Sequence, residues 1–456
     1  MFKTISPIDG SVLLEREFAS DQDIDAALDA AGKSEWRGLA LDARIEAVSK
    51  MVDAVVGKKD ELAKELTEQM GRPIRFAPGE IGGFEDRARR MIELAPESLA
   101  AIHPPEKDGF RRFVTREALG TVLVLSPWNY PWLTSVNAFV PALLAGNTVV
   151  LKHSEQTPLV AERLQEAAQA AGLPAGAFQF VHADNDQIAK VVGDERIAHV
   201  CFTGSVEGGR AVHKAAASRF VAMGLELGGK DPAYVREDAD FDFAVENLVD
   251  GSFFNSGQSC CGVERIYVHQ SHYERFLEAF VAKSKEYVLG DPRDENTTLG
   301  PVVRERNALA IQAQIDAAVH DGAKAHIEAP FAGSERGASY LGPQVLSGLT
   351  HKMTIMQEET FGPVACIMPV ADDAEAVALM NDSRFGLTAS VWSADLDRVA
   401  ALGVQLETGT VFANRCDALD PDLPWVGVKD SGRGATLGRV GFEHLTRAKS
   451  FHLRER

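Results

Sequence analysis

The stretch from Ala118 to Leu151 contains no charged side chain, and this feature constrains the fold more than any other. An uncharged run of this length could span a bilayer as a helix. It is interrupted, however, by Pro127, Pro131 and Pro141, and its apolar residues fall into short β-branched runs around a helix-like piece. The pattern predicts a strand, a loop, a helix and a second strand, buried as in a parallel sheet covered on both faces. We therefore expect no integral membrane segment.

After Thr121, short β-type runs alternate with amphipathic helices, whereas the chain up to about Ala100 is helical and rich in charge. The strand candidates of this region are Thr121–Leu125, Thr148–Leu151, Phe178–Val181, Ala198–Phe202 and Phe220–Leu225. Such alternation is typical of a doubly wound parallel sheet, which binds ligands at the carboxyl ends of its strands. A second α/β region begins at about Gly228, with strand candidates Ile266–Val268, Pro363–Val370, Ser390–Trp392 and Thr410–Phe412. The sequence thus predicts two packed α/β domains with a cleft between them.

The charge and cysteine content narrow the possible partners and the compartment. The chain has 47 Lys and Arg against 66 Asp and Glu, a formal net charge of −19. Nucleic acid and anionic membranes both attract basic surfaces, so neither is expected as a partner. Five cysteines, including the adjacent pair Cys260 and Cys261, favour reduced thiols, and the N-terminus shows no apolar signal core. We therefore expect a cytoplasmic protein.

Two polar turns carry groups that could perform covalent chemistry. Cys260 follows Gly257 and Gln258 on a glycine-containing turn just after a helix-like stretch. Taken alone, such a cysteine is more often a small buried residue. Glu226 ends a predicted strand, where active sites form in parallel sheets, although Lys230 could simply neutralise it.

Three further segments lie directly after predicted strands. Ser126–Trp132 is a proline-framed aromatic loop, in which the Asn129 amide could donate to an oxyanion or merely cap its own backbone. Phe202–Gly209 runs into a glycine-bearing helix start, which suits an anion but lacks the full dinucleotide fingerprint. Lys152 and Glu155 could hold ribose hydroxyls or form a surface pair. The histidines show no metal-ligand spacing, so no metal is expected.

In their order and approximate spacing, these segments resemble the aldehyde dehydrogenase superfamily over essentially the whole chain. The matching motifs are Pro127-Trp128-Asn129-Tyr130-Pro131, Lys152 to Glu155, Phe202-Thr203-Gly204-Ser205, Glu226-Leu227-Gly228-Gly229-Lys230, Gly257-Gln258-x-Cys260, Glu358-Glu359-Thr360-Phe361-Gly362-Pro363, Asn414 and Ser431-Gly432.

The resemblance implies oxidation of an aldehyde to the free carboxylic acid through a cysteine thiohemiacetal and thioester. Cys260 would be the nucleophile, Glu226 the general base, and Asn129 with the Cys260 backbone N–H the oxyanion hole. Members that pass the acyl group to coenzyme A usually lack this glutamate, so hydrolysis is expected.

The resemblance also implies a division of the α/β chain into domains. Residues 1–99 and 119–227 would form the dinucleotide-binding domain, and residues 228–430 the catalytic domain that carries the thiol. The segments 100–118 and 445–456 contain alternating stretches that would form a small β extension for oligomerisation. Because unpaired strand edges recruit another subunit, a homo-oligomer is expected, either a dimer or a tetramer.

The cofactor implied by the resemblance is NAD, with NADP possible but less favoured. The positions that would contact it are Ser126, Trp128, Lys152, Glu155, Gly204, Ser205, Gly209, Leu227, Glu359 and Phe361. Glu155 should accept hydrogen bonds from a ribose diol and repel a 2′-phosphate, although Lys152 could offset that repulsion. Gly208 departs from the aliphatic residue usual in the family, and Ala435 and Thr436 replace the usual Arg-Glu.

The predicted substrate tunnel is apolar and aromatic. By the resemblance it would include Tyr130, Trp132, Phe254, Leu419 and Trp425, a set that suits a medium or long aliphatic aldehyde or an aromatic one. These rings could instead be packed core.

Arg415, beside Asn414, opens a different possibility for the substrate. A buried guanidinium there could bind the carboxylate of a semialdehyde such as succinate semialdehyde.

Two interpretations from other classes of protein stay open. A thiol esterase would use Cys260 and Glu226 without redox chemistry, but it would have no need of Lys152 and Glu155. A non-catalytic structural relative would have no reason to keep both the thiol and the carboxylate. NADH production from a short aldehyde separates all three.

Overall fold

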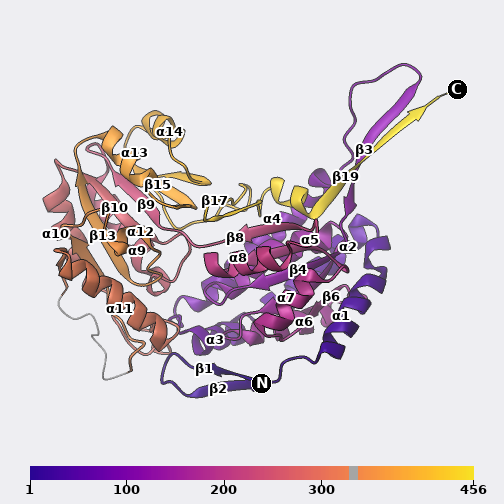
Figure 1. The fold of residues 1–456 in the computed structure, drawn as a ribbon, viewed down its shortest axis with the longest axis horizontal. Helices are drawn as coiled ribbons and strands as arrows, with labels where there is room; N and C mark the ends of the chain where they lie inside the picture. Colours follow the sequence, from indigo (N-terminus) through magenta and orange to yellow (C-terminus); the bar gives the residue numbers. More distant parts are fainter. Residues whose placement is uncertain (328–336, 456) are drawn as a thin grey trace.

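The computed structural model describes residues 1–327 and 337–455. It contains a six-stranded sheet, a seven-stranded sheet and a two-stranded arm (Figure 1). Two short pairs complete the strands, β1 (Phe2–Ile5) with β2 (Val12–Arg16), and β14 (Phe385–Gly386) with β17 (Val428–Lys429). The α/β class predicted from the sequence is confirmed.

The six-stranded sheet has the order β18-β8-β7-β4-β5-β6. Its five parallel strands are β4 (Thr121–Ser126), β5 (Thr148–His153), β6 (Phe178–Phe180), β7 (Ile197–Thr203) and β8 (Ala222–Glu226). Side chains of β4 alternate between two cores. Val122 and Val124 pack with the helices of one face, and Leu123 and Leu125 with those of the other. The sheet is therefore covered on both faces, as its uninterrupted apolar runs predicted.

Helices occupy both faces of this sheet. One face packs against α2 (Leu41–Val56), α4 (Ala77–Ser98), α5 (Pro131–Leu144) and α6 (Pro158–Ala170), with α3 (Lys59–Met70) beside α4. The other packs against α1 (Asp21–Lys33), α7 (Asn185–Gly193) and α8 (Val206–Ala215). The uncharged stretch becomes β4, α5 and β5, and within the described ranges no helix has both the length and the apolar character needed to cross a bilayer.

One edge of this sheet differs from the prediction. The short strand β18 (Gly432–Arg433) returns from late in the chain and pairs antiparallel with β8, so that Gly432 lies opposite Glu226. No strand was predicted for this segment. Because β18 pairs with β8, the chain after Gly432 lies beside the end of β8.

The second sheet has the order β11-β12-β13-β10-β9-β15-β16. Its strands are β9 (Asp231–Val235), β10 (Val263–His269), β11 (Lys324–Ala325), β12 (Gln344–Ser347), β13 (Val364–Val370), β15 (Thr388–Trp392) and β16 (Thr410–Ala413). The helices of this region are α9 (Phe241–Phe253), α10 (Tyr273–Ser284), α11 (Glu305–His320), α12 (Thr354–Gln357), α13 (Asp373–Asn381) and α14 (Leu396–Gly403). The four predicted strands are present, whereas β9, β11 and β12 were not predicted.

The arm consists of β3 (Phe110–Ala118) and β19 (Thr446–Arg454), which project together from the rest of the molecule (Figure 1). The two strands are antiparallel, and the Phe113 and Phe451 rings stack with their centroids 4.5 Å apart. The two predicted extension strands thus pair with each other. The second edge of β19 has no partner among the described strands, and on the second edge of β3 an isolated bridge joins Val114 to Ile102 while the rest of that edge pairs with no described strand.

Candidate active site

The segment that presents Cys260 has an unusual backbone. Asn255 and Ser256 both have left-handed φ angles, 54° and 57°, and Gly257 follows with 67°. A Cβ at Gly257 would collide with the Gly362 carbonyl, so only glycine fits there. The Ser256 hydroxyl donates to the Gly300 carbonyl at 2.8 Å, which helps to hold this conformation. The turn leads Cys260 into a cavity of about 370 Å³.

The two adjacent cysteines have different surroundings. Cys260 is partly exposed, whereas Cys261 is buried and its thiol donates to Asp417 Oδ1 at 3.0 Å. A hydrogen bond with Cys260 and burial both raise the pKa of Cys261 well above its usual range. Asp417 also accepts from the Ser259 hydroxyl at 2.8 Å, and burial raises its pKa to about 6. Asp417 was not predicted from the sequence.

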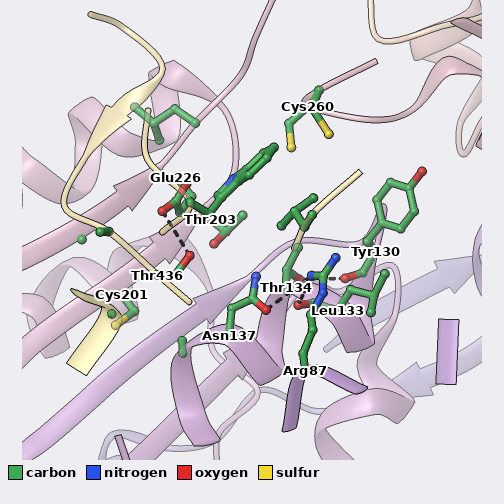
Figure 2. A pocket seen from close by; sticks show the side chains of 18 of the residues that line it. Arg87, Tyr130, Leu133, Thr134, Asn137, Cys201, Thr203, Glu226, Cys260 and Thr436 are labelled. Carbon is green, nitrogen blue, oxygen red and sulfur yellow. Dashed lines mark hydrogen bonds between the residues drawn. The ribbon is translucent and has the colours of Figure 1, made fainter. Parts of the chain in front are cut away.

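Glu226 closes β8 and faces the same cavity (Figure 2). Its Oε1 accepts from the Thr436 hydroxyl at 3.4 Å, and its buried Oε2 has no hydrogen-bond partner in the described parts of the chain. Burial raises the pKa of Glu226 well above its usual range. Lys230 does not neutralise it, because that ammonium pairs with Glu264 and donates to Thr360 at 3.0 Å. The alternative of a Glu226–Lys230 pair is wrong.

Asn129 is held beside the cysteine segment by buried polar contacts. Its side-chain amide donates to the Gln258 carbonyl at 3.1 Å. Arg72 donates to the Asn129 carbonyl at 2.9 Å and to Asn255 Oδ1 at 3.0 Å, and it forms a buried ion pair with Glu80. Sequence reasoning missed Arg72 and Glu80, because each looks like an ordinary charge within a helical region.

The turn from β7 into α8 contains three of the predicted cofactor residues. The Ser205 hydroxyl caps α8 by accepting from the Gly208 N–H at 3.1 Å. A Cβ at Gly209 would lie 2.6 Å from the Leu227 side chain, and one at Gly208 would lie 2.7 Å from the Phe202 ring. The Phe202 ring also lies close over Gly204. The departure from the family pattern at Gly208 therefore has a steric cause, and the open helix end suits a phosphate.

Glu359 and Phe361 are positioned by Glu264. The Glu264 carboxylate accepts from the backbone N–H groups of Thr360 and Phe361, each at 2.9 Å. Glu359 accepts from the Gly229 N–H at 2.9 Å, and burial raises its pKa to about 8. The Phe361 ring meets Trp128 edge to face, with centroids 5.7 Å apart.

Lys152 and Glu155 line a second, polar cavity of about 910 Å³ together with Arg304. Burial lowers the pKa values of Lys152 and Arg304. Ser126 is buried at the end of β4, where its carbonyl accepts from the Ser154 N–H at 3.0 Å.

The predicted substrate residues separate into two groups. Tyr130, Phe254, Leu419 and Trp425 line the cavity that holds Cys260 and Glu226. Trp132 does not, because it is 1% exposed and packs edge to face on Phe84, 5.7 Å between centroids. Arg415 is exposed and outside the cavity lining, which corrects the prediction of a buried guanidinium. The sequence analysis did not predict Arg87, which does line the cavity.

A dinucleotide-type sheet beside a cavity with a thiol and an unpaired carboxylate defines a class of enzymes that oxidise carbonyl compounds through a cysteine. The chain belongs to the aldehyde dehydrogenase family, whose sequence model matches residues 1–451. This confirms the resemblance and makes the protein an oxidoreductase.

Relatives and solved structures agree with this assignment. The chain is 34% identical over 447 residues to a succinate semialdehyde dehydrogenase [NAD(P)+] of Escherichia coli, covering 97% of this chain and 96% of that one. It is 34% identical to a phenylacetaldehyde dehydrogenase of Pseudomonas fluorescens, over 98% of this chain and 91% of that one. The crystal structure of an NAD-dependent aldehyde dehydrogenase from Sinorhizobium meliloti matches with a TM-score of 0.96 at 33% identity, covering 99% and 91% of the two chains.

Proposed function

We propose that this protein oxidises an aldehyde to the free carboxylic acid, with Cys260 as nucleophile, Glu226 as general base and NAD as hydride acceptor. One observation carries the proposal. The cavity that holds the partly exposed Cys260 thiol also holds the half-buried Glu226, whose Oε2 is buried and whose carboxylate has no cationic partner in the described ranges. A carboxylate in such surroundings can take a proton from water near neutral pH.

Acylation begins when the Cys260 thiolate attacks the carbonyl carbon and forms a thiohemiacetal. One hydrogen of the Asn129 amide is donated to the Gln258 carbonyl, which leaves the other for the oxyanion, together with the Cys260 backbone N–H. Because Arg72 and Asn255 both hydrogen-bond the Asn129 carbonyl, this donor is fixed before substrate binds.

Several positions of the chain fit a nicotinamide dinucleotide, which when bound accepts the hydride that leaves the carbonyl carbon as the thioester forms. The start of α8, where Ser205 caps the Gly208 N–H and Gly209 makes room for the Leu227 side chain, would hold the pyrophosphate. Glu359 lies against Gly228, where a Cβ would be too close to the carboxylate, and would hold the nicotinamide ribose.

The preference for NAD over NADP rests on Glu155. Its carboxylate forms no ion pair with a described residue, so it is available to a ribose diol and repels a 2′-phosphate. Lys152 and Arg304 line the same cavity and weaken that repulsion.

Hydrolysis then completes the turnover. Glu226 takes a proton from a water molecule, the resulting hydroxide attacks the thioester carbon, and the Cys260 thiolate leaves as the acid forms. Cys261 takes no part, because its thiol is buried against Asp417.

The cavity walls favour an aldehyde with an apolar skeleton, either a medium or long aliphatic chain or an aromatic ring. Tyr130, Phe254, Leu419 and Trp425 supply these walls. The similarity to a phenylacetaldehyde dehydrogenase supports this choice, and the similarity to a succinate semialdehyde dehydrogenase supports the semialdehyde alternative.

We assign the activity to a cytoplasmic homo-oligomer. The five free cysteines suit a reducing compartment. The arm formed by β3 and β19, which has open edges, supports contact with a second subunit.

Replacing Glu226 with Gln tests the proposed mechanism. Hydride transfer precedes the entry of water, so Glu226→Gln should release a burst of about one equivalent of NADH per active site. Steady turnover should then be slower by on the order of a hundredfold, the usual effect of losing a positioned base. Rapid-mixing absorbance at 340 nm measures both phases, with NAD and NADP assayed in parallel.

Two matched cysteine variants serve as controls for this experiment. Cys260→Ala should show neither burst nor turnover, whereas Cys261→Ala should keep both largely intact. An unchanged steady state in Glu226→Gln would refute the base assignment. Acid or alcohol released from an ester with no NADH from any aldehyde would favour the esterase instead.

A further inference from the structure

Arg87 projects from α4 into the cavity that holds Cys260 and Glu226 (Figure 2). Its Nη1 donates to the Leu133 carbonyl at 3.0 Å and to Asn137 Oδ1 at 3.3 Å, both on α5. These two neutral acceptors fix the guanidinium at the cavity wall.

Arg87 has no carboxylate partner in the part of the chain that the structure describes. Other arginines of the same helix do, since Arg89 pairs with Asp53 and Glu85, and Arg90 pairs with Glu93 and Asp422. The Nε and Nη2 groups of Arg87 likewise make no hydrogen bond to a described residue. The cavity therefore contains a cation with unused, forked donors.

Partial burial makes the absence of a counter-charge at Arg87 unfavourable for the free protein. Desolvation lowers the pKa of Arg87, and the charges of Cys261, Glu80 and Cys260 oppose that effect, although none of the three forms a hydrogen bond or ion pair with the guanidinium. Arg87 is half-buried, and a cation partly withdrawn from water without an ion pair is stabilised when a ligand supplies the counter-charge.

The remaining ionisable groups of the cavity do not supply that charge. Glu226, Asp250 and Asp417 line it together with His199 and His444, and none of them forms an ion pair with Arg87. Asp417 already accepts hydrogen bonds from Ser259 and Cys261. Burial raises the pKa of Glu226 and of Asp250, which disfavours their charged forms. A ligand carboxylate is the chemical group that matches the free N–H donors of the Arg87 guanidinium.

We propose that Arg87 binds a carboxylate at the far end of the substrate, so that the preferred substrates are aldehydo acids whose two groups are separated by an apolar chain or ring. The inference rests on the proposed function, because it takes this cavity as the substrate site. It reconciles the apolar walls with the cation: Tyr130, Phe254 and Leu419 contact the spacer while Arg87 holds the acid. Arg87 thereby takes the carboxylate-binding role that the sequence suggested for Arg415, which lies outside the cavity lining.

A matched pair of substrates tests the charge alone. 4-Carboxybenzaldehyde and methyl 4-formylbenzoate share a ring and an aldehyde, and only the first is anionic. The wild-type protein should have the higher kcat/KM for the acid. Arg87→Gln should lower kcat/KM for the acid by about 100-fold, because the desolvated carboxylate loses its charged partner. The same variant should change kcat/KM for the ester by less than about threefold. Arg87→Lys should have a kcat/KM for the acid between those of the wild-type protein and Arg87→Gln, because lysine keeps the charge but cannot form the bidentate hydrogen bonds of a guanidinium.

Arg89→Gln provides the control, because it removes the same charge from the outer side of α4 and should leave the acid-to-ester ratio unchanged. A higher kcat/KM of the wild-type protein for the ester, or an equal fall in kcat/KM for both substrates in Arg87→Gln, overturns the proposal.

A binding measurement separates this proposal from the proposed function. In Cys260→Ala, which cannot form the thiohemiacetal, calorimetry should show 4-carboxybenzaldehyde binding about tenfold more tightly than methyl 4-formylbenzoate, and the additional Arg87→Gln change should abolish the difference. If the wild-type protein forms no NADH from either aldehyde, the proposed function fails. The difference in binding affinity then shows by itself whether Arg87 binds the ligand carboxylate. Equal binding of the two ligands in both backgrounds overturns the assignment of Arg87.

Discussion

At the scale of single residues, the ionisation of Glu226 depends on very few contacts. Burial raises its pKa, and the one hydrogen bond that opposes this effect comes from the Thr436 hydroxyl at 3.4 Å. Thr436 stands where the family usually has an acid, so this chain has placed a neutral donor beside its candidate base. The donor favours the ionised carboxylate, which is the form that accepts a proton.

Thr436→Val should therefore make the base harder to ionise. Without the donor the pKa of Glu226 rises, a smaller fraction is ionised at a given pH, and kcat near pH 7 should fall by about two- to fivefold, the effect of one weak hydrogen bond. The rising limb of the pH–kcat profile should move to higher pH. Thr436→Ser keeps the hydroxyl and should retain the wild-type profile. A valine variant with an unmoved profile would show that Thr436 does not tune the base.

At the scale of secondary structure elements, the buried Arg72–Glu80 pair joins α4 to the loop that carries Asn129. Glu80 also accepts from the Trp132 N–H at 2.9 Å, at the start of α5. Both side chains are almost fully buried, so removing one leaves the other without its counter-charge.

Glu80→Leu should lower the free energy of unfolding by about 3 to 5 kcal/mol, the usual cost of breaking a buried pair from one side. Arg72→Met combined with Glu80→Leu should recover part of that loss. Its kcat should stay low, however, because Arg72 no longer holds Asn129. Thermal unfolding and steady-state assays measure the two effects. Glu85→Gln, which alters an exposed pair on the same helix, should change stability by less than about 1 kcal/mol. A single Glu80 variant as stable as the wild-type protein would contradict this role.

The sequence predicted the elements with strong local patterns and missed those that depend on distant partners. The five parallel strands of the six-stranded sheet were predicted to within two residues at each end, because buried parallel strands appear in a sequence as unbroken apolar runs. β9 was missed because Asp231-Pro232 at its start is typical of a turn. β18 has two residues, and only its pairing with β8 defines it.

The same division holds for the candidate site. Cys260, Glu226 and Asn129 lie in or directly beside recognisable turns and were predicted. Arg87 and Asp417 were not, because only the packing of separate segments brings them to the cavity.

At the scale of the whole molecule, the arm is the part least able to stand alone. A two-stranded ribbon is marginally stable in water, and β3 and β19 form such a ribbon away from both large sheets (Figure 1). Contact with a second subunit would cover the open edges and stabilise the arm.

Light scattering at micromolar concentration should therefore show a dimer or a larger assembly. Phe451→Glu, which disrupts the ring stack with Phe113, should shift the protein toward the monomer, because the ribbon loses its main apolar contact. Val404→Glu changes another exposed apolar residue, at the end of α14, and should leave the assembly intact. A monomeric wild-type protein would rule out the oligomer.

The antiparallel strand β18 also has a consequence for how the molecule is made. Glu226 lies on β8, which without β18 would be the edge strand of its sheet, and its partner Gly432 is translated only after the entire second sheet. While the ribosome is still extending the chain, β8 keeps an open edge, and Thr436 has not yet been synthesised. A nascent chain thus contains Cys260 and Glu226 before the Thr436 donor of Glu226 exists, and until β18 forms, β8 has the kind of open strand edge that favours aggregation.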